Sequence, residues 1–294
     1  MTATVEEPRS SIVAWEATDC LLCGSPQRLP VIEARQGSAG VVRCRACGLC
    51  YTSPRPARGS MAAFYPDDYE PHQGRPKRRR AWRRPRVAIA RHGEGRLLDF
   101  GCGRGSFLET MHSLGWEVLG VDFAETAVRR IRGDLGLPAV LGDLFSAELA
   151  GRRFDLITMR HSLEHVHGPR EMLEQARRLL VPGGRLMVWV PNVESLPARW
   201  FGPAWFGLDL PRHLVHFAPS TLRRMVTEAG FHVDRQWMVS HSSWVQRSAR
   251  QARREGRLPI ALRLAVWRPA ARAVAWYCRL RGRSDCIAIQ ATRP

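Results

Sequence analysis

The sequence predicts an α/β protein with a mostly parallel sheet, preceded by a small cysteine-rich module. From residue 96 onward, short apolar runs alternate with segments of helical periodicity, which is typical of strand–helix–strand units. The first apolar run, Leu97–Phe100, leads into three glycines at alternate positions, and a helix-compatible segment follows them. Two pairs of cysteines, each with two residues between its members, lie between residues 20 and 47.

The elements of the body can be placed in order along the chain. Strands are expected at Leu97–Phe100, Glu117–Val121, Ala139–Leu141, Phe154–Met159, Arg185–Val190, Phe231–Val239 and Cys286–Ala291. Helices are expected at Ser106–Leu114, Glu125–Leu135, Arg170–Leu180 and Ser220–Ala229. We divide the chain into a polar leader (1–19), the cysteine-rich module (20–56), a helical and basic linker (57–93) and the body (94–294) with an aromatic insert (196–217).

The turn after the first strand contains Gly101, Gly103 and Gly105. Since glycine has no Cβ, this turn can adopt positive φ and let a ligand approach the backbone closely. The N–H groups at the start of the following helix would attract a carboxylate or another polar edge of that ligand. The turn therefore predicts a binding site for a nucleotide-like ligand.

An acidic residue follows each of the next two strands. Asp122 can accept hydrogen bonds from both hydroxyls of a ribose, or it can cap the next helix. Asp143 can accept a hydrogen bond from an adenine amino group, or it can form an ordinary loop turn. The GxGxG spacing differs from the GxGxxG of dinucleotide-binding folds.

Five motifs in this order resemble those of class I S-adenosylmethionine-dependent methyltransferases: LLDFGCGRG, VLGVD, GD, FDLI and LVPGG. The resemblance covers residues 94–240 and the final strand. It implies a Rossmann-like class I methyltransferase sheet with an antiparallel last strand, and S-adenosyl-L-methionine as the cofactor. It also implies that the methionine part binds at Asp99, Gly101, Gly103 and Gly105, the ribose at Asp122 and the adenine at Asp143.

Candidate bases follow the fourth strand, where ligands of open α/β sheets bind. His161, Glu164 and His165 lie within about one helical turn there. The segment resembles ubiquinone-pathway O-methyltransferases, whose Glu-x-x-Glu-His pattern can hold a divalent metal, although His161 replaces the first Glu here. We predict His161 and His165 as catalytic residues; the alternative is that Glu164 and His165 brace the helix.

The aromatic insert supplies further candidates. Its stretch Asp209–Phe217 and the stretch after the cysteines resemble bacterial methyltransferases found with saccharide and natural-product genes. His213 is a candidate catalytic or orienting group. The candidates for the acceptor side are Tyr65, Tyr69, Trp200, Trp205, Asp209 and His216. The alternative is that the aromatic side chains pack onto the sheet.

The cysteines form the second strong motif. Cys20 and Cys23 are separated by 20 residues from Cys44 and Cys47, and a glycine follows each pair. This spacing is typical of a zinc ribbon with four thiolate ligands, in which the metal is structural because its coordination is closed. Disulfide bonds are the alternative, which is unfavourable for a cytoplasmic protein.

The charge is concentrated outside the body of the sheet. The net charge is +18, but segments 75–92 and 247–283 carry nine and eleven basic residues with a single acidic one, so the remainder carries −1. This pattern disfavours, without excluding, a nucleic-acid groove across the site. We expect a cytoplasmic protein, with peripheral contact to the inner membrane surface through the basic segments as an alternative.

The first functional hypothesis is methyl transfer to an oxygen of a small-molecule, sugar or natural-product acceptor, free or carrier-linked. The second is an RNA base methyltransferase that uses the zinc ribbon to recognise its substrate. Against the second, an Asn-Pro-Pro-Tyr motif is absent after the fourth strand. The third is a non-catalytic zinc-ribbon binding module, which the intact glycines, Asp122 and Asp143 disfavour.

Overall fold

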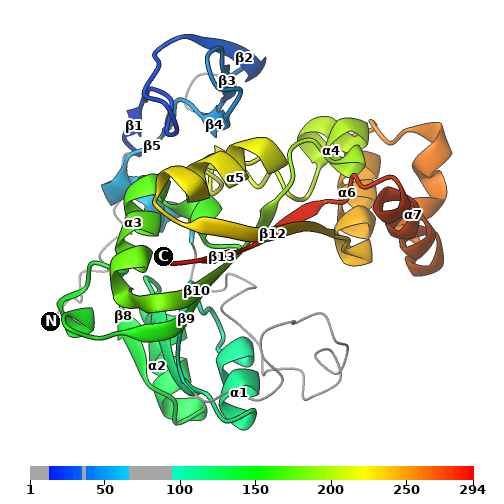
Figure 1. Cartoon of the computed structure of the whole chain (residues 1–294). Coiled ribbons are helices and arrows are strands. Elements are labelled where there is room, and N and C mark those ends of the chain that lie inside the picture. Colours follow the sequence, from blue (N-terminus) through cyan, green and yellow to red (C-terminus); the bar gives the residue numbers. More distant parts are fainter. Residues whose placement is uncertain (1–12, 35–37, 66–94) are drawn as a thin grey trace, which may run out of the picture.

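The structure, a computed structural model, describes residues 13–34, 38–65 and 95–294. Its centre is a seven-stranded sheet in the order β12-β13-β10-β9-β6-β7-β8 (Figure 1). The strands are β6 (Arg96–Phe100), β7 (Glu117–Asp122), β8 (Ala139–Leu141), β9 (Phe154–Arg160), β10 (Leu180–Pro191), β12 (His232–Val239) and β13 (Cys286–Thr292). Strands β6 to β10 are parallel, and β13 is antiparallel to both of its neighbours. The predicted Rossmann-like sheet with an antiparallel last strand is confirmed.

Helices cover both faces of this sheet, because crossovers between parallel strands are almost always right-handed and the strand order reverses at β6. One face is covered by α1 (Ser106–Ser113) and α2 (Glu125–Asp134), and the other by α3 (Pro169–Leu179) and α5 (Pro219–Glu228) (Figure 1). Each helix buries an apolar stripe; α1, for example, buries Phe107, Leu108 and Met111. The loops at the carboxyl ends of the parallel strands are thereby left to form a site.

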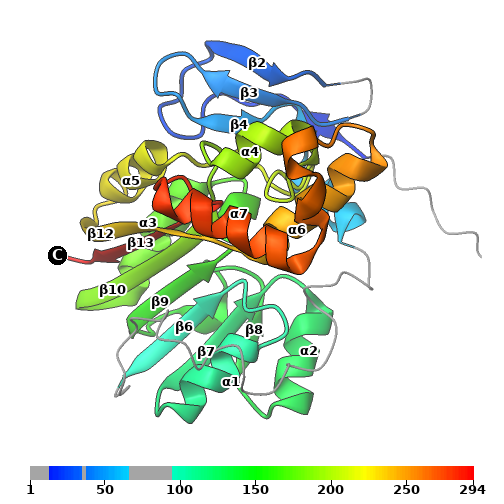
Figure 2. The same ribbon diagram turned by 90° about the vertical axis from the view of Figure 1, so that its right-hand side faces the viewer.

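A second helical group adjoins the ends of β12 and β13 (Figure 2). It comprises α4 (Leu196–Phe201), α6 (Ser242–Arg254), a 3-10 segment (Ile260–Val266) and α7 (Arg268–Leu280). These elements share a second hydrophobic cluster, which includes Phe201, Trp205 and Val245 and extends to Val41 and Cys50 of the cysteine-rich module. Within the described part of the chain, no helix has the length and apolar character needed to cross a membrane.

The cysteine-rich module packs directly on the body. Its strands β2 (Arg28–Ile32), β3 (Val41–Cys44) and β4 (Cys50–Thr52) form a sheet that is completed by β11 (Val215–His216) from the insert. Strands β1 (Trp15–Glu16) and β5 (Arg55–Pro56) pair beside it. Leu22, Leu49 and Tyr51 lie in the same buried cluster as the sheet face under α3 and α5. The module and the body therefore share one core.

Candidate active site

The glycine turn joins β6 to α1 at the carboxyl edge of the sheet. Gly101, Gly103 and Gly105 have φ values of 71°, 51° and 75°, a region that favours glycine. Space is also limited, since a Cβ on Gly101 would lie 2.4 Å from Cβ of Ser162 in the loop after β9. The turn and the loop with the candidate bases are thus in direct contact.

Asp122 is placed against this turn. Its side chain is buried; Oδ2 accepts a hydrogen bond from the N–H of Gly103 at 2.8 Å, and Oδ1 accepts from the N–H of Ala124 at 2.9 Å. A carboxylate offers about four lone-pair sites, so both oxygens keep capacity for a further donor. The geometry agrees with a ribose ligand and also includes the capping bond to the start of α2.

We expect Asp122→Asn to weaken binding of S-adenosylmethionine by about 10- to 100-fold, because a hydrogen bond to a charged group contributes about 1.5–3 kcal/mol. The substitution replaces one acceptor oxygen by an amide donor that faces the backbone N–H groups. Isothermal titration calorimetry would measure the affinity, with Asp134→Asn at the exposed end of α2 as the control. Unchanged affinity in Asp122→Asn would remove Asp122 from the binding site.

Asp99 lies beneath the turn rather than on its surface. It is 2% exposed, and its Oδ1 accepts a hydrogen bond from Oγ1 of Thr158 at 2.6 Å. Burial raises the pKa of Asp99 to about 6, against the attraction of the nearby Arg160 guanidinium. Its role toward the methionine part of a ligand stays a prediction; in the structure it links β6 to β9.

Asp143 forms the loop turn after β8, with Oδ1 accepting from the N–H of Phe145 at 2.8 Å. Phe145 and Phe123 follow the two acidic residues, and each is 53% exposed. Exposed rings at the carboxyl edge of a sheet suit the flat faces of an adenine. These phenylalanines were not among the predicted site residues, although their position beside Asp122 and Asp143 could have indicated them.

Glu164 is the centre of the candidate acceptor side. It is 0% exposed, and neither of its carboxylate oxygens has a hydrogen-bond partner within the described residues. Oε1 lies 3.5 Å from Nδ1 of His161 and 4.0 Å from Nε2 of His213. Burial raises the pKa of Glu164 to about 7. A buried carboxyl between two imidazoles is typical of a proton-handling site.

His161 begins the loop after β9 with a φ of 55°, which is uncommon for a residue other than glycine. One third of its side chain is exposed, whereas Nδ1 is buried toward Glu164. Burial lowers the pKa of His161 to about 3, so the ring is neutral at pH 7. The exposed surface of the His161 side chain therefore belongs to its other ring atoms, which can contact an acceptor.

His213 and His165 complete the cluster from two different segments. Nδ1 of His213 lies 2.9 Å from the carbonyl oxygen of Gly207 and must donate to it, which leaves Nε2 as an acceptor facing Glu164. Burial lowers the pKa of His213 well below its ordinary value. The rings of His165 and His213 lie 4.6 Å apart. The structure thus brings all three predicted histidines together.

A second histidine–carboxylate pair adjoins the first. Nδ1 of His241 lies 3.4 Å from Oδ1 of Asp285, and its ring stacks on Trp244 at 4.9 Å. The ring of His161 lies 6.0 Å from that of His241 and 5.1 Å from that of Trp244. His241, Trp244 and Asp285 were not predicted from the sequence, because only the meeting of the ends of β12 and β13 brings them to the site.

Tyr65 reaches the site from the segment after the cysteine-rich module. Its hydroxyl lies 2.8 Å from Nδ1 of His165, and its ring contacts that of Phe123 at a centroid distance of 4.8 Å. It therefore bridges the candidate acceptor and cofactor sides. Tyr69, which was predicted with it, lies outside the described residues.

The other insert residues lie at different depths. Trp205 is 3% exposed in the cluster of the second helical group, and Trp200 stacks on Tyr277 of α7. These are the positions of packing residues. Asp209 pairs with Arg212, and its Oδ2 lies 3.8 Å from Nε2 of His213, so it adjoins the cluster.

His216 is buried at the contact between the body and the cysteine-rich module. Its Nε2 lies 3.1 Å from Oγ1 of Thr52, which donates to the carbonyl of His213 at 2.6 Å. Burial lowers the pKa of His216 to about 4. The Thr52 hydroxyl thus ties the module to the strand that follows His213, and a role of His216 toward an acceptor stays a prediction.

Comparison with known proteins identifies the family to which the chain belongs. A family described as a methyltransferase domain matches residues 75–236. This match spans more than half of the chain. The chain belongs to that family. It contains a class I S-adenosylmethionine-dependent methyltransferase domain.

Individual relatives of this methyltransferase agree. The ubiquinone biosynthesis O-methyltransferase of Cereibacter sphaeroides is 35% identical over 163 residues, which are 51% of this chain and 66% of that protein. An uncharacterized 37.1 kDa protein in transposon TN4556 of Streptomyces fradiae is 39% identical over 114 residues, covering 36% of this chain and 33% of that protein. The match thus spans between a third and two thirds of these relatives.

One solved structure supports the fold. A chain in the complex between the Haloferax volcanii Trm112 methyltransferase activator and a methyltransferase has a TM-score of 0.52 with this methyltransferase at 17% identity. The match covers 69% of this chain and 84% of that chain.

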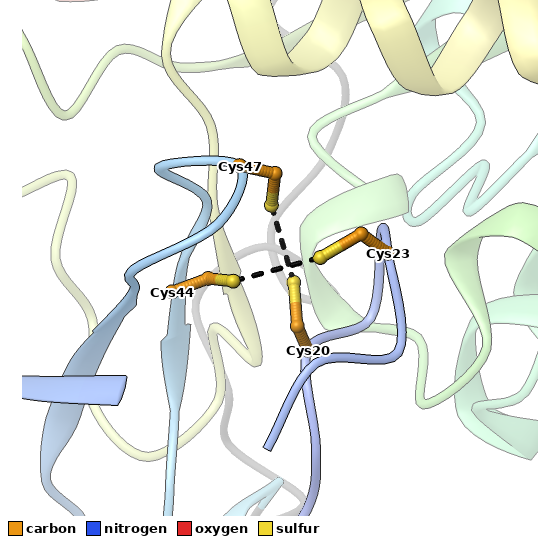
Figure 3. Close-up of side chains that lie close together, drawn as sticks. All are labelled: Cys20, Cys23, Cys44 and Cys47. Atoms are coloured by element: carbon orange, nitrogen blue, oxygen red, sulfur yellow. Dashed lines mark hydrogen bonds between the residues drawn. The ribbon is translucent and has the colours of Figure 1, made fainter. Parts of the chain in front are cut away.

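The four predicted cysteines of this methyltransferase converge (Figure 3). Their sulfurs all lie within 4.8 Å of one another; the pairs Cys20–Cys47 and Cys23–Cys44 are 3.3 Å and 3.6 Å apart. Sulfurs of a tetrahedral zinc site with Zn–S distances of about 2.3 Å lie about 3.8 Å apart. The donor set and its spacing therefore fit a zinc ion.

A second donor set fits a divalent cation. It consists of a carboxylate oxygen of Glu164 and one imidazole nitrogen from each of His165 and His213, which all lie within 4.8 Å of one another. Nδ1 of each histidine lies beside a backbone carbonyl, that of Arg212 or of Gly207, which is the arrangement that orients metal-binding imidazoles. Such a cation would polarise an acceptor oxygen.

Proposed function

We propose that this methyltransferase transfers the methyl group of S-adenosylmethionine to an oxygen of a small-molecule acceptor, such as a sugar or a natural product, free or linked to a carrier. The observation that carries the proposal is the buried Glu164 between His161 and His213, beside the glycine turn. A base is required at an oxygen acceptor, because a hydroxyl must lose its proton as the methyl group arrives. The name of the Cereibacter sphaeroides relative, an O-methyltransferase, supports oxygen as the acceptor atom.

In this proposal His161 removes the proton, since its ring is neutral and one third of its side chain is exposed. Oε1 of Glu164 lies 3.5 Å from Nδ1 of His161 and stabilises the imidazolium that forms, as the carboxylate does in a catalytic triad. Nε2 of His213 lies 4.0 Å from the same carboxyl group on its other side. The sulfonium of the cofactor supplies the leaving group, and alignment supplies much of the rate.

The rate of methyl transfer should rise with pH through about 7 and then level off. Burial holds the pKa of Glu164 near that value, and only the carboxylate form can stabilise a charged His161. Glu164→Gln should lower the rate by about 10²- to 10⁴-fold and abolish this rise. The pH profile of kcat/KM would be measured for both proteins with the same acceptor.

Matched controls keep this test specific. Glu109→Gln and His112→Ala alter exposed side chains on α1 and should leave the profile unchanged. His241→Ala tests whether the second pair is the base instead, in which case it would lose the rate that His161→Ala keeps. Activity lost on chelation and restored by Mg²⁺ or Mn²⁺ would favour the cation at Glu164, His165 and His213 over a base.

We also propose that the four cysteines hold a structural zinc ion. The fit of the sulfur positions and the packing of the module on the body support it. The cofactor residues are proposed as predicted: Asp99 and the glycines for the methionine part, Asp122 for the ribose and Asp143 for the adenine. An RNA acceptor would instead require binding that weakens steeply with salt.

A further inference from the structure

The second helical group presents a surface that is both apolar and strongly basic. Residues 257–283 contain seven arginines and no acidic residue. Five large apolar side chains of this segment are exposed by 60–76%: Ile260, Leu264, Trp267, Trp276 and Leu280. We name this surface the α7 face. It lies beyond residue 236, where the family match ends.

The helical periodicity of α7 separates this face from its buried side. Ala271, Ala275 and Cys278 are buried, and the two alanines belong to the cluster shared with α6. Arg272, Trp276 and Leu280 follow at intervals of four residues and are all exposed, so they form one outward row. Figure 2 shows α7 as the outer layer of the helical group. These apolar side chains are therefore not part of the chain's own core.

The composition of the α7 face favours one class of binding partner over two others. A second copy of this chain would bring two sets of arginines together without acidic residues to oppose them. A nucleic acid would match the arginines, but the aliphatic side chains of Ile260, Leu264 and Leu280 would gain little from a phosphate backbone. An anionic bilayer matches both features, since arginines meet lipid phosphates while tryptophans and leucines enter the headgroup region.

We propose that the α7 face docks this methyltransferase peripherally on the surface of an anionic lipid bilayer. The same helical group also forms one wall of the candidate active site, because Trp244 of α6 contacts the rings of His161 and His241. Docking would bring that wall toward the membrane surface, where a lipid-linked acceptor resides. This last step rests on the proposed function, whereas the docking does not.

Vesicle co-sedimentation of the full chain tests the docking without an acceptor. Vesicles of phosphatidylcholine alone would be compared with vesicles of phosphatidylcholine and phosphatidylglycerol. We expect binding to the anionic vesicles only, weakened by salt. The double variant Trp267→Ala/Trp276→Ala should lower the partition coefficient by about tenfold or more, because it removes the two exposed tryptophans of the α7 face.

Matched variants distinguish binding through the α7 face from non-specific attraction of the basic protein to anionic vesicles. Leu114→Ala removes an exposed apolar side chain after α1 and should bind like the parent protein. Equal binding by the double variant and the parent would overturn the proposal, and so would absence of binding to anionic vesicles. A dimer of the parent protein that the double variant loses would assign the face to a second copy instead. Circular dichroism would verify that each variant is folded.

Discussion

Gly101→Ala should abolish measurable use of S-adenosylmethionine while the protein stays folded. The new Cβ would lie 2.4 Å from Cβ of Ser162, and the residue would be held at a φ of 71°, where side chains other than glycine are strained. Relief requires the turn to move away from the loop after β9, which displaces the backbone that must cradle the cofactor. We expect the affinity to fall by at least about 100-fold, which corresponds to about 3 kcal/mol.

Calorimetric titration with S-adenosylmethionine would measure this effect, and Gly133→Ala provides the control. Gly133 lies within α2, its φ is not positive, and a Cβ there meets nothing within 4 Å. Alanine at that position should leave affinity unchanged and stabilise the helix slightly. Equal affinity for Gly101→Ala and the parent would show that the cofactor does not approach this turn.

Removal of the zinc ion, or Cys44→Ser combined with Cys47→Ser, should unfold the cysteine-rich module and destabilise the body with it. Structural zinc contributes about 10–16 kcal/mol of apparent free energy in small domains. Here the loss would extend further, because Tyr51 and Leu49 share the core under α3 and α5. Strand β11 would also lose its pairing with β4.

Elemental analysis should find about one zinc ion per chain in the parent protein and none in the double variant. Thermal unfolding should show a large fall in Tm, and amide exchange should speed up at Val215 and His216. Cys50→Ala is the control, since Cys50 is not one of the four converging cysteines. A metal-free protein with an unchanged Tm would contradict a structural metal.

The sheet could be predicted from sequence because most of its strands are rich in buried apolar residues. β6 extends from Arg96 to Phe100 and was expected from Leu97 to Phe100. The prediction differed at Leu180, which was expected to end a helix but begins β10. A register shift between Leu180 and Arg185 lets the Pro-Gly-Gly segment continue the strand. The Pro-Gly-Gly segment has a high propensity for a turn, so its irregular pairing within a strand was not predicted.

The candidate site could be predicted where its residues follow parallel strands or lie in a segment that resembles known methyltransferases. His161 and His165 were found because they follow β9, and His213 because its segment resembles known methyltransferases. The pair of His241 and Asp285 comes from the antiparallel end of the sheet and has no motif. Trp205 was predicted on the acceptor side but lies in a buried hydrophobic cluster. An aromatic-rich insert has the same composition whether it packs in a core or covers a ligand, so the sequence could not distinguish the two.

The central claim is that the donor and the acceptor meet at the carboxyl edge between the glycine turn and the Glu164 cluster. A crystal structure with S-adenosylhomocysteine tests it most directly. We predict the ribose hydroxyls on Asp122, the adenine between Phe123 and Asp143, and the sulfur facing His161. A product molecule bound with its sulfur directed away from His161 and Glu164, or bound elsewhere on the chain, would contradict this account.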